Sequence, residues 1–313
     1  MEILQIIIPK RMKDQRIDAA LSEMIPDYSR SKINAWIKSG EALINNKTFK
    51  PKAKVNGDET VCLKLKQKDN NRWIPERINL DIVFEDDDII VINKPFGLVT
   101  HPGAGNWSGT LANALLHHDF HLSSLDRAGI VHRLDKNTSG LMVVSKNLKS
   151  QKFLVEQLQN HSVEREYSAI VYGHMISGGT INEPIGRDPK DRVKQAILTN
   201  GKQAITHYRV IDRFKSHTHV KAILETGRTH QIRVHLSHIE HPLIGDPMYG
   251  GRVRFPKKAC QELKDELINF QRQALHSKKL TLTHPSTGKS MTWRAELPDD
   301  MQVLLNILKK YDS

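Results

Sequence analysis

The amino-acid sequence predicts an α+β protein, built on a large mixed, mainly antiparallel sheet and preceded by a small separate module. From residue 80 onward, apolar runs of strand length are numerous and amphipathic helical patterns are few, which favours α+β over a regular alternation of strands and helices. Residues 16–65 carry their own helical pair and short strands. A chain of 313 residues is long enough for two unequal cores. We therefore expect a small domain at 1–70, a linker at 71–79 and a large domain at 80–313.

The small domain is expected to begin with two helices. Apolar residues recur at helical spacing from Ile17 onward, and Pro26 ends that pattern. Ser29 is a suitable N-cap for a second helix, which carries Trp36 on its apolar face. Strands are then expected at 42–44 and 61–65, so the core of this domain lies at about 16–65.

The large domain is expected to contain many strands and few helices. Strands are predicted at 82–84, 89–92, 141–144, from 165 onward, and at 180–185, 195–198, 204–214 and 219–226. Helices are predicted at 111–115, 148–159, 230–239 and 301–308. The Asn200-Gly201 pair is typical of a hairpin turn, so we expect the two strands on either side of it to pair.

The charge indicates a polyanionic partner. The chain has 47 Lys and Arg against 35 Asp and Glu, a net charge of +12. This favours nucleic acid or an anionic membrane. No apolar run approaches the roughly 18 residues of a membrane span, which makes nucleic acid the better candidate. Two distant cysteines, Cys62 and Cys260, are most simply reduced thiols, so we expect a cytoplasmic protein.

Three common kinds of site are disfavoured by spacing. Glycines stand at 103, 105 and 109, but a dinucleotide-binding G-x-G-x-x-G needs one at 108, which is Ser108. A G-x-S-x-G hydrolase motif around Ser139 needs glycine at 137, which is Asn137. The histidines at 230, 235, 238 and 241 include no H-E-x-x-H. We expect no nucleotide cofactor, no other cofactor and no metal.

The stretch from Gly129 to Ser145 carries the chemistry. It reads GIVHRLDKNTSGLMVVS, a polar loop between two apolar runs of strand length. Reactive groups are often placed on loops that a sheet holds rigid. His132, Arg133 and Asp135 lie within four residues of each other there. The loop is therefore the first candidate for an active site.

Three motifs resemble the RluA-type pseudouridine synthases. They are H-R-L-D-x-x-T-S-G at 132–140, R-E-Y-x-A at 165–169 and T-G-R-T-H-Q-I-R-V-H at 226–235. The resemblance covers about 16–305, and D-Y-S-R-S-K-I with G-x-x-x-I-N resembles the small RNA-binding domain of the ribosomal-protein-S-four type. It implies the pseudouridine synthase fold and an enzyme that isomerises uridine in RNA without a cofactor. HPGAGN and HPLIGDPMYGG look most like the members that act on large-subunit (23S) ribosomal RNA.

The resemblance also assigns the site residues. Asp135 matches the indispensable aspartate, which helps to break the N-glycosidic bond as a nucleophile, a proton-abstracting base or an electrostatic stabiliser; the sequence does not choose among these. Arg233 is implied to hold that carboxylate ionised. Tyr167 is expected to stack on the extruded uracil. Arg133 is expected to contact phosphate or to fill the space that the base vacates.

Two basic regions flank the Asp135 segment and are expected to bind RNA. Residues 1–70 carry 14 basic and 9 acidic side chains, and residues 187–233 carry 11 and 4. The expected RNA contacts are Arg16, Arg30, Lys32, Lys38, Arg187, Arg192, Lys194 and Arg228. The expected partner is large-subunit ribosomal RNA, within or near an assembling particle. Two alternatives remain: a non-catalytic RNA-binding assembly factor on the same scaffold, or a family member that acts on another structured RNA.

Overall fold

A computed structural model of the chain describes residues 2–25, 28, 30–65, 73–103 and 105–312. The chain divides into two compact units, Met1–Arg72 and Trp73–Ser313. Residues 73–79, which we expected in a linker, belong to the second unit. The amide nitrogen of Glu76 donates to Asn113 O, and Asn113 Nδ2 donates to Ile74 O. The expected positions Pro26 and Ser29 lie outside the described residues.

The first unit is a three-stranded antiparallel sheet covered by two helices. The sheet has the order β1 (Glu2–Ile7), β3 (Thr60–Leu65) and β2 (Ala42–Ile44). A short 3-10 helix, η1 (Lys10–Met12), precedes α1 (Ile17–Met24) and α2 (Arg30–Ser39). Leu21, Ile33 and Trp36 are buried in the core between helices and sheet. Strand β1 was not predicted. It alternates exposed Ile3 and Ile7 with residues that face this core, the period of a half-buried strand.

The second unit is built on one large mixed sheet, which has nine strands among the described residues. The order is β4-β5-β6-β13-β7-β12-β11-β8, with β14 paired to β13. The only parallel pairing within it, in the part of the chain that the structure describes, joins β13 to β6. Its strands are β4 (Ile82–Glu85), β5 (Ile89–Lys94), β6 (Ser139–Ser145), β7 (Glu164–Tyr172), β8 (Gly179–Asn182), β11 (Ile205–Arg213), β12 (His217–Leu224), β13 (Leu275–Thr283) and β14 (Ser290–Arg294).

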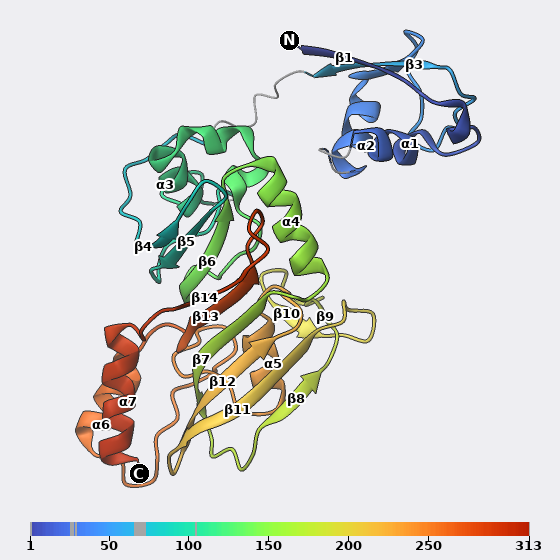
Figure 1. Cartoon of the computed structure of the whole chain (residues 1–313). Helices are drawn as coiled ribbons and strands as arrows, with labels where there is room; N and C mark the ends of the chain where they lie inside the picture. The colour runs from blue at the N-terminus through green and yellow to red at the C-terminus, as the bar shows by residue number, and fades with distance from the viewer. Residues whose placement is uncertain (1, 26–27, 29, 66–72, 104, 313) are drawn as a thin grey trace. The chain divides into compact units, whose positions relative to one another are not determined.

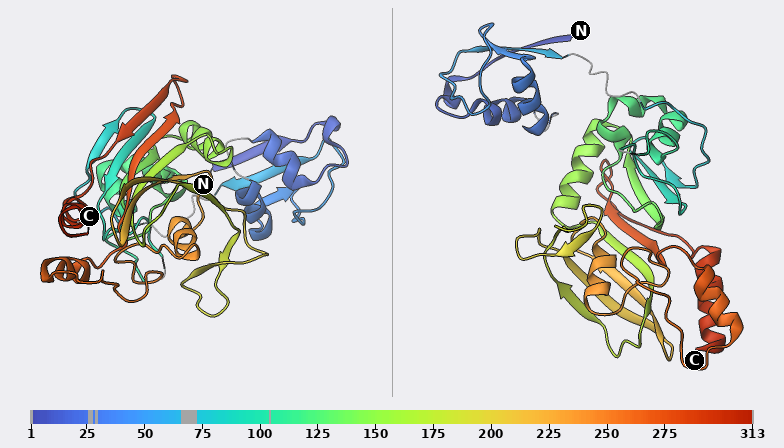
Figure 2. Two further views of the ribbon diagram at one scale, coloured as in Figure 1. Left: turned by 90° about the horizontal axis from the view of Figure 1, so that it is seen from below. Right: turned by 180° about the vertical axis from the view of Figure 1, so that it is seen from behind.

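Helices cover both faces of this sheet (Figures 1 and 2). They are α3 (Leu111–His118), α4 (Leu148–Gln159), α5 (Gln231–His238), α6 (Gln261–Asn269) and α7 (Asp299–Tyr311). On β7, Tyr167, Ala169 and Val171 face one core, to which α3 and α5 contribute. Ile170 and Tyr172 face the opposite core, with α6 and α7. Alternation along β7 therefore places Tyr167 on the same side as α5.

Polar side chains cap the first turns of two helices. Thr110 caps α3 in a reciprocal pair with Asn113, and Asn147 accepts a hydrogen bond from Ser150 N at the start of α4. Helix α5 was predicted to begin at residue 230, but it begins at Gln231. His230 is its N-cap, with a φ of 57°, and its side chain makes no capping hydrogen bond. No helix in the described residues is long and apolar enough to cross a membrane.

The hairpin predicted at Asn200-Gly201 is wrong. The turn forms, and Gly201 N donates to Leu198 O. However, β10 (Gln195–Ile197) pairs with β9 (Ile185–Arg187) in a separate two-stranded ribbon, and β11 pairs with β8 and β12. The turn therefore joins two sheets rather than two neighbours in one sheet. The run Ile130-Val131 is likewise no strand; Ile130 makes one isolated bridge to Val144.

Candidate active site

Hydrogen bonds from buried polar side chains hold the loop that carries Asp135. Lys94 is 1% exposed, and its ammonium donates to the carbonyl oxygens of Pro95, Leu98 and Lys136. Thr100 Oγ1 donates to Leu134 O at 2.8 Å. These bonds fix the backbone on both sides of Asp135. Burial lowers the pKa of Lys94 to about 7, although the charge of Asp135 acts to raise it.

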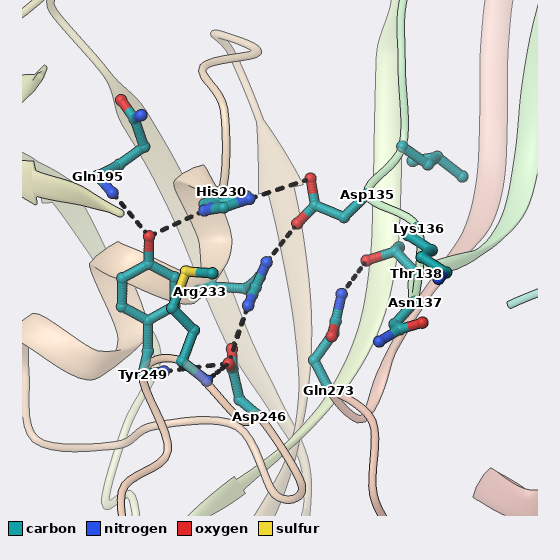
Figure 3. Close-up of polar contacts among 12 residues, drawn as sticks. Asp135, Lys136, Asn137, Thr138, Gln195, His230, Arg233, Asp246, Tyr249 and Gln273 are labelled. Carbon is teal, nitrogen blue, oxygen red and sulfur yellow. Dashed lines mark hydrogen bonds and ion pairs between the residues drawn. The ribbon is translucent and has the colours of Figure 1, made fainter. Parts of the chain in front are cut away.

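Arg233 joins Asp135 to a second, buried carboxylate (Figure 3). Its NH1 donates to Asp135 Oδ2 at 2.8 Å, its Nε to Asp246 Oδ2 at 2.7 Å and its NH2 to Asp246 Oδ1 at 2.9 Å. Burial alone lowers the pKa of Arg233, but the hydrogen bonds and charges of Asp246 and Asp135 outweigh it and raise the pKa. The guanidinium is therefore a permanent cation whose plane is fixed by a bidentate pair.

Asp246 is itself fixed by the backbone. It is 2% exposed, and its Oδ1 also accepts hydrogen bonds from the amide nitrogens of Met248 and Tyr249. Both oxygens of this carboxylate are thus used to hold Arg233. Asp135, with 18% of its side chain exposed, has its Oδ1 free of any hydrogen bond among the described residues, and it lines the cavity.

A second series of polar contacts leads to Asp135 through His230, at the start of α5. Gln195 N donates to the Tyr249 hydroxyl at 2.9 Å, and that hydroxyl lies 2.9 Å from His230 Nδ1. The other ring nitrogen of His230, Nε2, lies 3.9 Å from Asp135 Oδ1. Burial lowers the pKa of His230, and Asp135 opposes that shift, so the ring is neutral near pH 7. Tyr249 also lies under Arg233, whose guanidinium carbon is 5.0 Å from the ring centroid.

Of these groups, Asp135, His230 and Arg233 line one cavity of about 550 Å³. Asp135, Tyr167 and Arg233 all face it, from the loop before β6, from β7 and from α5. Tyr167 is 5% exposed; burial raises the pKa of its phenol, which stays neutral. The volume suits a single extruded nucleoside together with part of its backbone. A carboxylate, a neutral aromatic ring and a fixed cation therefore meet in one pocket.

The other expected site residues lie at different places. Arg133 and Arg228 are exposed at the cavity, and Arg228 Nε donates to Gln203 O. Arg187, Arg192 and Lys194 lie on the ribbon of β9 and β10 and the turn between them, with Arg187 and Arg192 exposed.

In the first unit, the expected RNA contacts differ in how free they are. Arg16 and Arg30 both pair with buried Asp18, yet 46% and 49% of their side chains are exposed. Lys38 is exposed. The side chain of Lys32 lies outside the described part of the chain. The two arginines therefore present a net charge of +1 rather than +2 to any ligand.

Several residues were missed by sequence reasoning. Asp246, Tyr249 and Lys94 all act by holding another site group. Asp246 and Tyr249 stand in HPLIGDPMYGG, a segment that the resemblance singled out without giving either residue a role. His132 was noticed in the loop, and it proves structural: its Nε2 accepts from Val143 N at 3.0 Å, and burial lowers its pKa to about 3.

One group outside the cavity has the geometry of a metal site. Ligand atoms of Asp86, Asp88 and His284 lie within 4.8 Å of one another. The same atoms are engaged in the protein: His284 Nε2 lies 2.7 Å from Asp86 Oδ2, and Asp86 Oδ1 accepts from the amides of Asp88 and Ile89. These contacts join the β4–β5 turn to the turn after β13, and that bracing is sufficient to explain them.

The RNA pseudouridylate synthase family matches residues 88–238 of the chain, which include Asp135, Tyr167 and Arg233. Together with relatives of about half identical sequence along nearly the whole chain, this shows that the chain belongs to the RluA-type family of pseudouridine synthases. The predicted family, fold and enzyme class are confirmed.

The individual relatives are closely matched. The chain is 51% identical over 307 residues to the ribosomal large subunit pseudouridine synthase D of Escherichia coli (strain K12), covering 98% of this chain and 94% of that protein. It is 47% identical to the protein of the same name from Xanthomonas campestris pv. campestris, covering 98% and 92%. Among solved structures, human RNA pseudouridylate synthase domain containing 4 is 27% identical with a TM-score of 0.57, covering 73% of this chain and 92% of that one.

Proposed function

We propose that this protein isomerises specific uridines of large-subunit ribosomal RNA to pseudouridine, with Asp135 as the catalytic carboxylate. The observation that carries the proposal is the ion pair of Asp135 with Arg233, backed by Asp246, in a cavity that Tyr167 also lines. The relatives named as synthases of the ribosomal large subunit support that substrate. With ribosomal RNA as its substrate, the protein acts in the cytoplasm, near assembling particles.

The geometry favours the following course. The target base leaves its stack and enters the cavity, where the Tyr167 ring offers a stacking surface that accepts a base through its π-face. Breaking the bond between N1 and C1′ builds positive charge on the ribose. Asp135 meets that charge with Oδ1, because Oδ2 is held by Arg233. The base then rejoins through C5 and loses the C5 proton. No redox change or group transfer takes place.

The first experiment tests the reaction and the substrate. Large-subunit ribosomal RNA without pseudouridine is incubated with the enzyme, and the modified positions are mapped. Asp135→Asn should abolish product while RNA affinity stays within about threefold, because charge rather than bulk is used in bond breaking. Asp87→Asn, at an exposed carboxylate, is the matched control. Turnover by the Asp135→Asn variant, with deamidation excluded by mass spectrometry, would contradict the assignment. RNA binding by the unaltered enzyme without any pseudouridine would favour a non-catalytic assembly factor.

We also propose that the first unit recruits structured RNA and that the β9–β10 ribbon grips the strand that enters the cavity. Arg16, Arg30 and Lys38 support the first part, and Arg187 and Arg192 support the second. Removing residues 1–72 should weaken binding and flatten its salt dependence, because fewer phosphates are neutralised. The rate at saturating RNA should persist. A folded truncated enzyme whose saturated rate collapses would contradict this division.

A further inference from the structure

The cavity contains a buried arginine that has no carboxylate partner among the described residues. Arg165, on β7, is 6% exposed. Its NH2 donates to the backbone oxygen of Glu225 at 3.2 Å, its Nε has no hydrogen-bond partner, and it forms no ion pair with any described residue. Burial lowers the pKa of the guanidinium, which nevertheless stays protonated because an arginine does not lose its proton in proteins.

The other buried arginines of the second unit, Arg233 and Arg272, each pair with a carboxylate. Arg233 has two carboxylate partners, and Arg272 forms a two-bond pair with Asp300 at 2.5 and 2.7 Å. A buried charge without a partner is costly to the folded state. The fold therefore carries at Arg165 an electrostatic cost that it avoids at the two comparable sites. A ligand that brings negative charge would remove this cost.

Arg165 is placed where such a ligand would enter. It stands two residues before Tyr167 on β7, so both side chains lie on the same face of the sheet, and both line the cavity with Asp135. Burial has the largest effect on the pKa of Tyr167 and raises it, while the charge of Arg165 acts to lower it and that of Asp135 to raise it. Space for the guanidinium depends on Gly227, where a Cβ would lie 2.7 Å from Arg165 NH1.

We propose that Arg165 binds the departing uracil and stabilises the negative charge that develops on it. This rests on the proposed function. When the bond between C1′ and N1 breaks, its electron pair stays on N1 and spreads onto O2 and O4, while C1′ becomes positive. Asp135 meets the positive ribose, and the N–H groups of Arg165 donate to a carbonyl oxygen of the anionic base. A fixed donor in a site closed to water acts strongly on such developing charge.

Uracil is favoured over phosphate as the ligand because of the surroundings. The exposed arginines of the cavity, Arg133 and Arg228, are better suited to a hydrated phosphate. Arg165 lies instead beside an aromatic ring, with the apolar side chains of Val155 and Leu275 also lining the cavity. A planar base covers such surfaces and leaves only its carbonyl edge to be paired.

The test compares Arg165→Met, which removes the charge at similar length, with Arg165→Lys, which keeps it. In single-turnover assays at saturating RNA, Arg165→Met should lower the rate about 100-fold or more, and Arg165→Lys should recover part of that loss. RNA affinity should stay within about threefold, and the slope of affinity against salt should not change. The melting temperature of Arg165→Met should equal or exceed that of the unaltered protein, because an unpaired buried charge has been removed.

A leaving-group series separates charge stabilisation from simple positioning. Fluorine at C5 of the target uridine stabilises the uracil anion, so consumption of 5-fluorouridine should suffer less from Arg165→Met than consumption of uridine does. Equal losses for the two substrates would overturn the charge role. A salt slope reduced by about one, with the rate restored by more RNA, would mean a phosphate contact instead. A lowered melting temperature with a normal saturated rate would mean a structural residue. Failure of the unaltered enzyme to form pseudouridine would refute the proposed function. The outcomes above compare Arg165→Met with an active unaltered enzyme, so they test the role of Arg165 separately.

Discussion

Asp246→Asn is the most informative single change in the second unit, because it alters the support of Arg233 without touching the cavity. Asp246 Oδ1 accepts hydrogen bonds from Arg233 NH2, Met248 N and Tyr249 N, so an asparagine must keep its oxygen on that side. Its amide nitrogen then faces Arg233 Nε across the 2.7 Å that now separates Nε from Oδ2. Two donors oppose each other there, and a buried negative charge is lost.

The magnitude follows from those contacts. Losing one hydrogen bond to a charged group costs about 1.5–3 kcal/mol, and breaking a buried ion pair costs about 3–5 kcal/mol. Arg233 keeps Asp135 as a partner, so we expect the free energy of unfolding to fall by about 2–4 kcal/mol. The guanidinium also loses the pair that fixes its plane. Because displacement of a catalytic group by about 1 Å can cost 100-fold, we expect the rate at saturating RNA to fall about 10- to 100-fold.

The assay combines thermal unfolding with single-turnover kinetics. The matched control is Asp312→Asn: Asp312 is 1% exposed and accepts hydrogen bonds from Ser216 N and His217 outside the cavity. Both variants should melt earlier than the unaltered protein, but only Asp246→Asn should be slow at a temperature where both are folded. A rate for Asp246→Asn within about twofold of the control would show that Asp246 serves stability alone, and the reasoning about Arg233 would be refuted.

Three further predictions concern single side chains. Tyr167→Phe should bind and turn over RNA nearly normally, while Tyr167→Ala should be clearly worse; a large defect in the Phe variant in a turnover assay would contradict stacking. Burial acts to raise the pKa of Asp18, but hydrogen bonds and charges of its two arginine partners lower it to about 2. Ionised Asp18 therefore contributes about 2 kcal/mol above pH 4, which is lost as pH falls through 2, and melting curves should show less acid sensitivity in Asp18→Asn. Burial lowers the pKa of His230, so the ring is neutral at pH 7 and above. His230→Gln, which cannot titrate, should therefore keep the shape of the rate profile between about pH 7 and 8; a changed shape there would show that His230 titrates.

The sequence predicted the elements whose signals lie within a few neighbouring residues. Helix α4 has the predicted bounds, because apolar spacing acts within a few residues. Strand β13 was missed although it lies between β6 and β7 in the sheet. Its sequence, LHSKKLTLT, contains two successive lysines, and a register shift at Ser277/Lys279 interrupts the alternation. Its place in the sheet depends on partners far away in the chain.

The active site likewise depends on contacts between residues that are far apart in the sequence. Asp135 and Arg233 are 98 residues apart, and only the family resemblance joined them before the structure placed them 2.8 Å apart. Asp246 was not found because it acts on Arg233 rather than on the substrate. The residues around Asp246 do not predict which cation its carboxylate will bind. Supporting groups of this kind are set by tertiary contacts, which a single sequence does not display.

The two buried arginines of the cavity suggest why the charges are arranged as they are. Glycosidic cleavage turns a neutral nucleoside into a positive ribose and a negative base. A site that neutralised every charge internally would have nothing left to stabilise that separation. Here Arg233 is paired twice and leaves one oxygen of Asp135 open, while Arg165 has no ion-pair partner among the described residues. Besides the exposed Arg133 and Arg228, the cavity therefore holds a carboxylate with one open oxygen and a buried cation without an ion-pair partner among the described residues. This arrangement is complementary to the charge-separated state rather than to uridine. The unpaired arginine destabilises the empty enzyme, and the same charge lowers the barrier once the base is bound.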